Sequence, residues 1–213
     1  MRTDELVAML AAGAARVDPD ATTRRFSTAL GWGAFAATLW MAIAMGVRPD
    51  LSEAALVPML WIKLAFPALL AVGALYAAAR LSRPGASLGR VPVVLAVPVL
   101  VIWAMAAYIL ATAAGPDRAA LMLGETWKEC PINIVMLSLP MFVLALWAMR
   151  GLAPTRPALA GAAAGLLAGA VGALAYAFHC PEMDAPFLAI WYSLGMLIPG
   201  AAGALIGPRL LRW

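Results

Sequence analysis

The chain has 213 residues and a net charge of +4, with 64% hydrophobic and only 12% charged residues. Its mean hydropathy is +0.89, so the chain is apolar on average. A soluble domain is about half apolar and about a quarter charged, so this composition excludes an ordinary soluble domain. The basic residues form neither a dense cluster nor a stripe with interleaved aromatics, which argues against direct binding of nucleic acid. The sequence therefore predicts a protein embedded in the lipid bilayer.

Residues 1–25 form a polar segment before the first apolar run. Asp4 and Glu5 suit the first turn of a helix, because acidic side chains interact favourably with the helix dipole there. The apolar side chains that then recur at helical spacing are Leu6, Met9 and Leu10. This pattern predicts a short amphipathic helix that ends near residue 18. No cleavage site of the signal-peptide kind follows, so we do not expect a signal peptide. The distribution of basic residues, described below, makes this segment a cytoplasmic tail.

Residues 26–213 are predicted to form an all-α transmembrane domain. Apolar runs of about 18–23 residues are long enough to cross a hydrocarbon layer about 30 Å thick as helices. The runs are continuous and lack the alternation of a membrane β-barrel, so helices are the only spanning structure that fits. The six predicted spans are 27–46, 57–79, 91–112, 132–149, 157–178 and 187–206.

The basic residues orient these spans. With the N-terminus inside, eleven Lys and Arg residues fall in inside segments and three in outside segments. Positive charge accumulates on the cytoplasmic side of membrane proteins, so both termini are predicted to be cytoplasmic. We therefore expect a multi-pass membrane protein with both ends of the chain on the same, cytoplasmic side.

Small residues recur every four positions in the last two spans. The residues in these rows are Gly161, Gly165, Gly169 and Ala173 in the fifth span, and Gly195, Pro199, Gly203 and Gly207 in the sixth. Such rows allow the backbones of two membrane helices to approach closely. They predict tight packing between helices, with a substrate path as the weaker alternative.

The two cysteines of the chain each precede a proline, in Cys130-Pro131 and Cys180-Pro181. Cys130 precedes the fourth span and Cys180 follows the fifth. Because a short inside loop joins these spans, both cysteines should lie close together on the outer side of the membrane. Residues nearby that could assist as ligands are His179, Glu129, Glu182 and Asp184. The pair could form a disulfide, bind a soft metal or act as a redox sensor, or have no partner.

Lys63 is the one charge inside a predicted span, which makes it a functional candidate. We expect its long side chain to snorkel towards Glu53 or the outer headgroups. The chain shows no nucleophile elbow, phosphate-binding glycine loop or metalloprotease helix, so we expect neither an enzyme nor a resident cofactor. Transient binding of a soft metal by Cys130 and Cys180 is the one ligand event the residues suggest.

Several segments resemble one family. They are Met1-Arg2-Thr3-Asp4-Glu5-Leu6, Glu129-Cys130-Pro131, His179-Cys180-Pro181-Glu182, Ala189-Ile190-Trp191-Tyr192-Ser193-Leu194-Gly195-Met196 and Arg209-Leu210-Leu211-Arg212-Trp213. In these segments, in length and in the number of spans, the chain resembles the NrsF-type membrane anti-sigma factors.

The resemblance implies that the protein sequesters an extracytoplasmic-function sigma factor at the bacterial inner membrane, with both cysteines on the periplasmic side. It also implies release of that factor under heavy-metal or oxidative stress, with Cys130 and Cys180 as the sensing residues. The partner-binding residues are then expected in the tail, and they are Asp4, Glu5, Leu6, Met9 and Leu10. A small transporter or channel for a metal ion or oxyanion is the alternative function.

Overall fold

The computed structural model describes residues 2–12, 20–83, 85–152 and 154–212. Over these residues the chain is helical without strands, which confirms the predicted all-α class. Six helical segments in this part are long and apolar enough to cross a membrane. They are α2 (Ala21–Ala44), α4 (Pro58–Leu81), α5 (Val91–Thr112), α7 (Cys130–Arg150), α8 (Pro157–Ala177) and Ala185–Leu210.

The helix boundaries agree closely with the predicted spans, with two differences. Helix α2 begins at Ala21, six residues before the predicted apolar run, because a helix continues through polar residues that lie outside the hydrocarbon layer. The last span is composite: α9 (Ala185–Phe187) leads into a π-helical turn, η1 (Leu188–Tyr192), and then into α10 (Ser193–Leu210).

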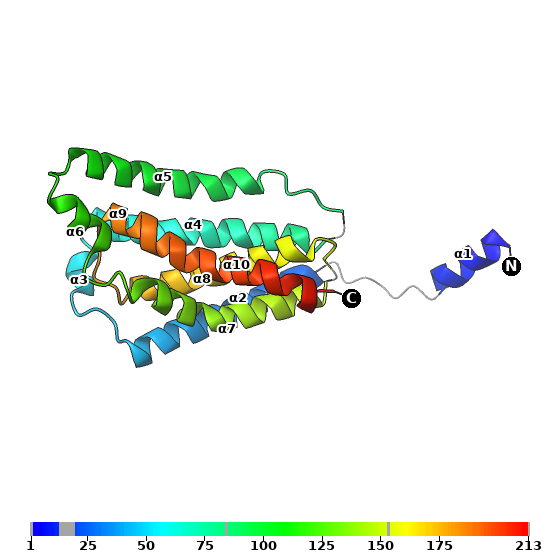
Figure 1. Cartoon of the computed structure of the whole chain (residues 1–213). Coiled ribbons are helices and arrows are strands. Elements are labelled where there is room, and N and C mark those ends of the chain that lie inside the picture. Colours follow the sequence, from blue (N-terminus) through cyan, green and yellow to red (C-terminus); the bar gives the residue numbers. More distant parts are fainter. Residues whose placement is uncertain (1, 13–19, 84, 153, 213) are drawn as a thin grey trace.

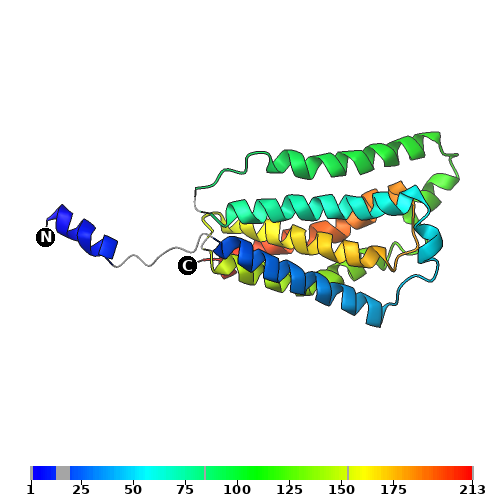
Figure 2. The ribbon, with the colours of Figure 1, turned by 180° about the vertical axis from the view of Figure 1, so that it is seen from behind.

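Short helices fill segments that the hydropathy pattern left as loops. They are α3 (Leu51–Ala54) and α6 (Asp117–Leu123). Figure 1 places both at the end of the bundle opposite the C-terminus, where α9 also lies. The chain enters α2 at the same end as the C-terminus, as an even number of crossings requires (Figures 1 and 2). The bundle therefore has one end where α2 begins and α10 terminates, and one end with the short helices.

Helix α8 is the centre of the bundle. It packs against α10, α7, α4 and α2, and 72% of its most apolar stretch is buried. The corresponding stretch of α5 is only 17% buried, and α5 lies at the edge of the bundle beside α4 (Figure 2). Because α8 consists largely of alanine and glycine, four neighbours can surround it at short distances.

The glycine rows make this packing possible. A Cβ added to Gly165 would meet the backbone of Pro199 and Gly200, and one added to Gly161 would meet the carbonyl of Gly203. The α8 and α10 backbones thus touch along the two rows, which confirms the prediction of tight packing. Gly172, on another face of α8, also lies against the α7 backbone, where an added Cβ would be 2.7 Å from the carbonyl oxygen of Ile134 and 2.9 Å from the nitrogen of Ser138.

Candidate functional site

Both cysteines lie at the end of the bundle that holds the short helices. Cys130 is the first residue of α7, with Pro131 in its first turn, and Cys180 follows α8 by three residues. Because α7 and α8 pack side by side, their ends bring the two cysteines into the same region of the bundle. A thiolate formed at one of them would act electrostatically on the other. Both side chains are 0% exposed and both thiols are free.

The backbone of Cys180 is fixed by a buried lysine from a different helix. Lys63, in α4, is 0% exposed, and its Nζ donates to the carbonyl oxygens of Cys180 at 2.6 Å and Glu182 at 2.7 Å. The same Nζ lies 5.6 Å from the ring centroid of Tyr192. Among the described residues no carboxylate forms an ion pair with this ammonium.

The expectation that Lys63 snorkels towards Glu53 or the headgroups is therefore wrong. Snorkelling occurs when water is the nearest group able to solvate the ammonium. Here α8 ends at Ala177, so the carbonyls of residues that follow have no helical partners and meet the lysine first. These carbonyls lie next to Lys63 because of how α8 packs against α4, which the sequence does not reveal.

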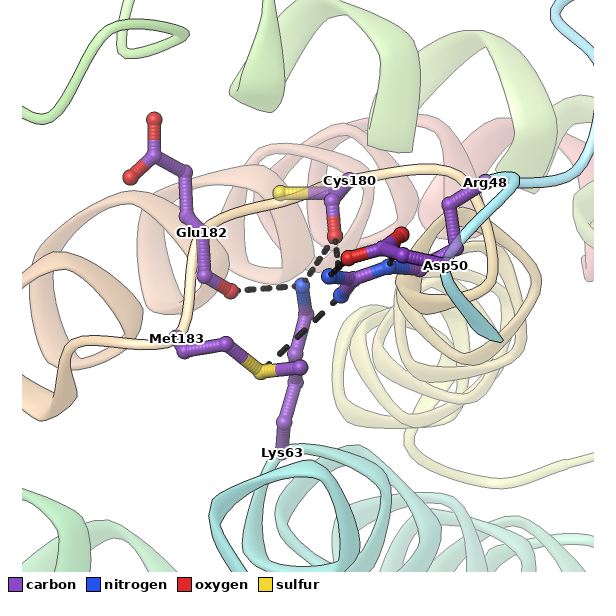
Figure 3. Close-up of polar contacts among 6 residues, drawn as sticks. All are labelled: Arg48, Asp50, Lys63, Cys180, Glu182 and Met183. Carbon is purple, nitrogen blue, oxygen red and sulfur yellow. Dashed lines mark hydrogen bonds and ion pairs between the residues drawn. The ribbon is translucent and has the colours of Figure 1, made fainter. Parts of the chain in front are cut away.

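Arg48 is a second cation that contacts the carbonyl oxygen of Cys180. It lies between α2 and α3, and its guanidinium holds Asp50 through two hydrogen bonds of 2.8 and 2.7 Å. The remaining nitrogen donates to the Cys180 carbonyl at 3.3 Å and approaches the Met183 sulfur at 4.0 Å. Figure 3 shows the Cys180 carbonyl pointing at both cations while its sulfur projects to another side.

The Arg48–Asp50 pair changes the acidity of its carboxyl group. The hydrogen bond from Arg48 lowers the pKa of Asp50, and the same interaction raises the pKa of Arg48. Arg48 also ties its own backbone to the site, because its N–H donates to the carbonyl of Phe178 at 3.0 Å. In the sequence, Arg48 is one of the three basic residues predicted on the outer side, and no local pattern indicates a role for it.

Two of the four residues expected as auxiliary ligands, His179 and Glu182, have other hydrogen-bond partners. Nδ1 of His179 lies 2.9 Å from the Gly46 carbonyl, and Glu129 is exposed. The Glu182 carboxylate accepts bonds from the N–H groups of Glu125 at 2.8 Å and Thr126 at 3.1 Å. Burial, and then Glu182, raise the pKa of Asp184. In the described part of the chain, no three His, Cys, Asp or Glu residues form a metal-binding group.

Two buried tyrosines complete the surroundings of the thiols. Tyr176, in the last turn of α8, and Tyr192, in the π-helical turn, have ring centroids 6.1 Å apart. Tyr192 is 0% exposed, and its hydroxyl has no hydrogen-bond partner among the residues that the structure describes. A π-helical turn frequently marks a functional site. The hydropathy of the sixth span gave no sign of this turn, because a π turn depends on tertiary packing.

The tail residues lie far from this site in sequence and are open to solvent. Helix α1 (Thr3–Ala12) has no buried residue, with Asp4 and Glu5 in its first turn. The three predicted anchors are exposed at 40%, 59% and 67%, for Leu6, Met9 and Leu10 in that order. The predicted end of the helix, near residue 18, lies outside the described residues. Within the described part of the chain, nothing covers this apolar stripe of α1.

The fold and the site define a multi-pass helical membrane protein with a buried thiol pair at one end of its bundle. Over residues 10–213 the chain matches the family described as "NrsF: Negative regulator of sigma F", and it belongs to that family. It is accordingly a negative regulator of a sigma factor, a regulatory protein rather than an enzyme.

Two curated relatives match over the full length of both chains. The chain is 53% identical to the "Probable anti-sigma-F factor NrsF" of Azospira oryzae over 213 residues. It is 45% identical to the "Anti-sigma-F factor NrsF" of Caulobacter vibrioides over 215 residues. No solved structure matches the chain. These relatives favour the regulator over the transporter that was the alternative from the sequence.

Proposed function

We propose that this protein holds an extracytoplasmic-function sigma factor at the cytoplasmic face of a bacterial inner membrane. Oxidants or soft metals acting on Cys130 and Cys180 from the periplasm release the factor. Full-length similarity to proteins named anti-sigma-F factors supports the partner class. The location of both thiols at one end of the bundle, opposite the end where α2 begins, is the observation that carries the sensing proposal.

The burial of both sulfurs limits which signals can act on them. Each cysteine is 0% exposed, so only a small reagent such as hydrogen peroxide or a metal ion reaches the pair without unfolding. Oxidation joins the two sulfurs and transfers two electrons and two protons to the oxidant. A soft ion such as Cd²⁺ would instead displace both thiol protons and bind the two thiolates. Either event brings the sulfurs into a new fixed geometry.

A reporter driven by the cell's sigma F tests the sensing step. We expect the double variant Cys130→Ser, Cys180→Ser to repress the reporter as well as wild type and to lose induction by cadmium or peroxide. Met183→Leu is the matched control, because it removes a neighbouring sulfur and leaves both thiols intact. Normal induction in the double cysteine variant would refute thiol sensing.

The exposed stripe of α1 is proposed as the sigma-binding segment. An amphipathic helix with apolar side chains at positions i, i+3 and i+4 suits a hydrophobic groove on a partner. The triple variant Leu6→Ala, Met9→Ala, Leu10→Ala should no longer retain sigma F on purified membranes and should express the reporter constitutively. Ala8→Ser with Ala11→Ser, on the opposite side of α1, is the control. Full repression by the triple variant would exclude α1 as the binding segment.

A further inference from the structure

Lys63 is unusual because it is a fully buried ammonium that is solvated by backbone carbonyls. A buried charge is costly unless hydrogen bonds replace the water it has lost. Lys63 donates two such bonds, of 2.6 and 2.7 Å, to carbonyl oxygens in the segment that contains Cys180 (Figure 3). The ammonium therefore follows these carbonyls if they move, since staying behind would leave it without acceptors.

The helix that carries Lys63 has a weak point one turn further on. Pro67 lies inside α4 and has no N–H, so the backbone carbonyl of Lys63 lacks its usual helical partner. Proline is the commonest cause of a bend in a helix. The side chain that contacts the thiol segment is therefore attached to the place where α4 bends most easily.

The far half of α4 leads to the other end of the bundle. Beyond Pro67 the helix continues to Leu81 without another proline. Near that end Arg80 donates to the Tyr76 hydroxyl at 2.6 Å and to the Ser87 carbonyl at 2.8 Å, which ties the helix to the connection before α5. A bend at Pro67 would thus shift a cationic segment at the end where α2 begins and α10 terminates (Figure 1).

We infer that Lys63 is a positioning residue that carries a displacement of Cys180 to α4, where Pro67 allows the helix to bend. This inference rests on the proposed function, because thiol chemistry supplies the displacement. The carbonyl of Cys180 belongs to the same residue as its sulfur, so a new sulfur geometry moves the acceptor that Lys63 holds. Arg48 gives the same carbonyl a second attachment, to the connection between α2 and α3.

The variant Lys63→Met separates thiol chemistry from its transmission. Methionine keeps an unbranched apolar side chain in the core but cannot donate to the two carbonyls. Lys128→Met is the matched control, because Lys128 is an exposed lysine beside Cys130 in the sequence. Membrane abundance, loss of free thiols after peroxide and sigma F reporter activity are measured in full-length protein. We expect Lys63→Met to repress normally and to lose free thiols as wild type does, yet to lose induction.

The outcomes distinguish a failure of this inference from a failure of the proposed function. Induction of Lys63→Met equal to that of Lys128→Met overturns the inference, and so does constitutive reporter activity, which would make Lys63 a clamp on the repressing state. If wild-type protein loses its thiols without releasing sigma F, the proposed function fails before Lys63 is involved.

A measurement on wild-type protein covers the case in which Lys63→Met does not accumulate. Hydrogen exchange is followed before and after peroxide treatment. We expect faster exchange in residues 178–184 and, together with it, in the first half of α4. Exchange that changes in 178–184 and stays constant throughout α4 overturns the inference.

Discussion

The Nζ of Lys63 lies 2.6 Å from the backbone carbonyl oxygen of Cys180, although 117 residues separate them. This bond makes α4 and the segment after α8 a single polar unit inside an apolar bundle. Arg48 reaches the same oxygen, so three parts of the chain meet at one carbonyl (Figure 3). Substitutions around this unit and in the helix contacts that support it should change the stability of the protein in specific ways.

The Glu182 carboxylate is expected to hold the connection between α6 and α7 in place. It accepts bonds from the backbone of Glu125 and Thr126 and from the Thr126 hydroxyl at 3.2 Å. Leaving these donors without their charged acceptor lowers the free energy of unfolding by about 1–3 kcal/mol. Glu182→Ala should lower the thermal unfolding midpoint of detergent-solubilised protein and speed hydrogen exchange at residues 125–126. Glu129→Ala, at an exposed site, is the control; equal midpoints for the two variants would contradict this role.

The contact between α8 and α10 should not tolerate a single added methyl group. A Cβ on Gly165 would lie 2.6 Å from the carbonyl carbon of Pro199 and 2.9 Å from the Cα of Gly200. Backbone atoms cannot rotate away, so the helices must separate, and overpacking of this kind costs about 1–3 kcal/mol. We expect Gly165→Ala to lower the unfolding midpoint measured by circular dichroism.

Gly31→Ala provides the opposite control for that experiment. This glycine also lies within a membrane-spanning helix, α2, yet a Cβ there would meet nothing within 4 Å. Alanine is favoured over glycine in a helix by about 1 kcal/mol, so stability should be unchanged or slightly higher. Similar losses in both variants would show that the effect is not specific to the α8–α10 contact.

The Arg48–Asp50 pair predicts a pH dependence of stability. Because the hydrogen bond from Arg48 lowers the pKa of Asp50 in the folded protein, the pair stabilises the fold above the ordinary carboxyl pKa of about 3.9. This stabilisation is lost as the pH falls below that value, towards the lower folded pKa. Wild type should therefore unfold at a higher temperature than Asp50→Asn at pH 7, and the difference should shrink below about pH 4.

Glu53→Gln tests whether this pH dependence belongs to the pair. Glu53 is an exposed acid in α3 on the same end of the bundle, and it forms no ion pair among the described residues. Its substitution should leave the midpoint close to that of wild type at pH 7. A difference between wild type and Asp50→Asn that stays constant from pH 7 to pH 3 would argue against the assigned cause.

The sequence alone determined the class of the fold, the number of spans and most of their boundaries. Hydropathy over about 20 residues is a local property, and the cost of exposing an unbonded backbone to lipid makes each such run a helix. The glycine rows were equally readable, because four-residue spacing places small residues on one helix face. The cysteine pair could be assigned to a single end because one short loop joins the two helices.

Only the tertiary structure decided what surrounds those cysteines. Lys63, Arg48 and Tyr192 come from three other parts of the chain, and nothing local in the sequence links them to Cys180. Lysine has a long side chain that can reach either headgroups or protein, and the choice depends on which acceptors lie nearest. That depends on where α8 ends relative to α4, a matter of helix packing. The sequence thus predicted that the two thiols share one end of the bundle, whereas only the packing of the helices brings Lys63 into contact with the Cys180 backbone.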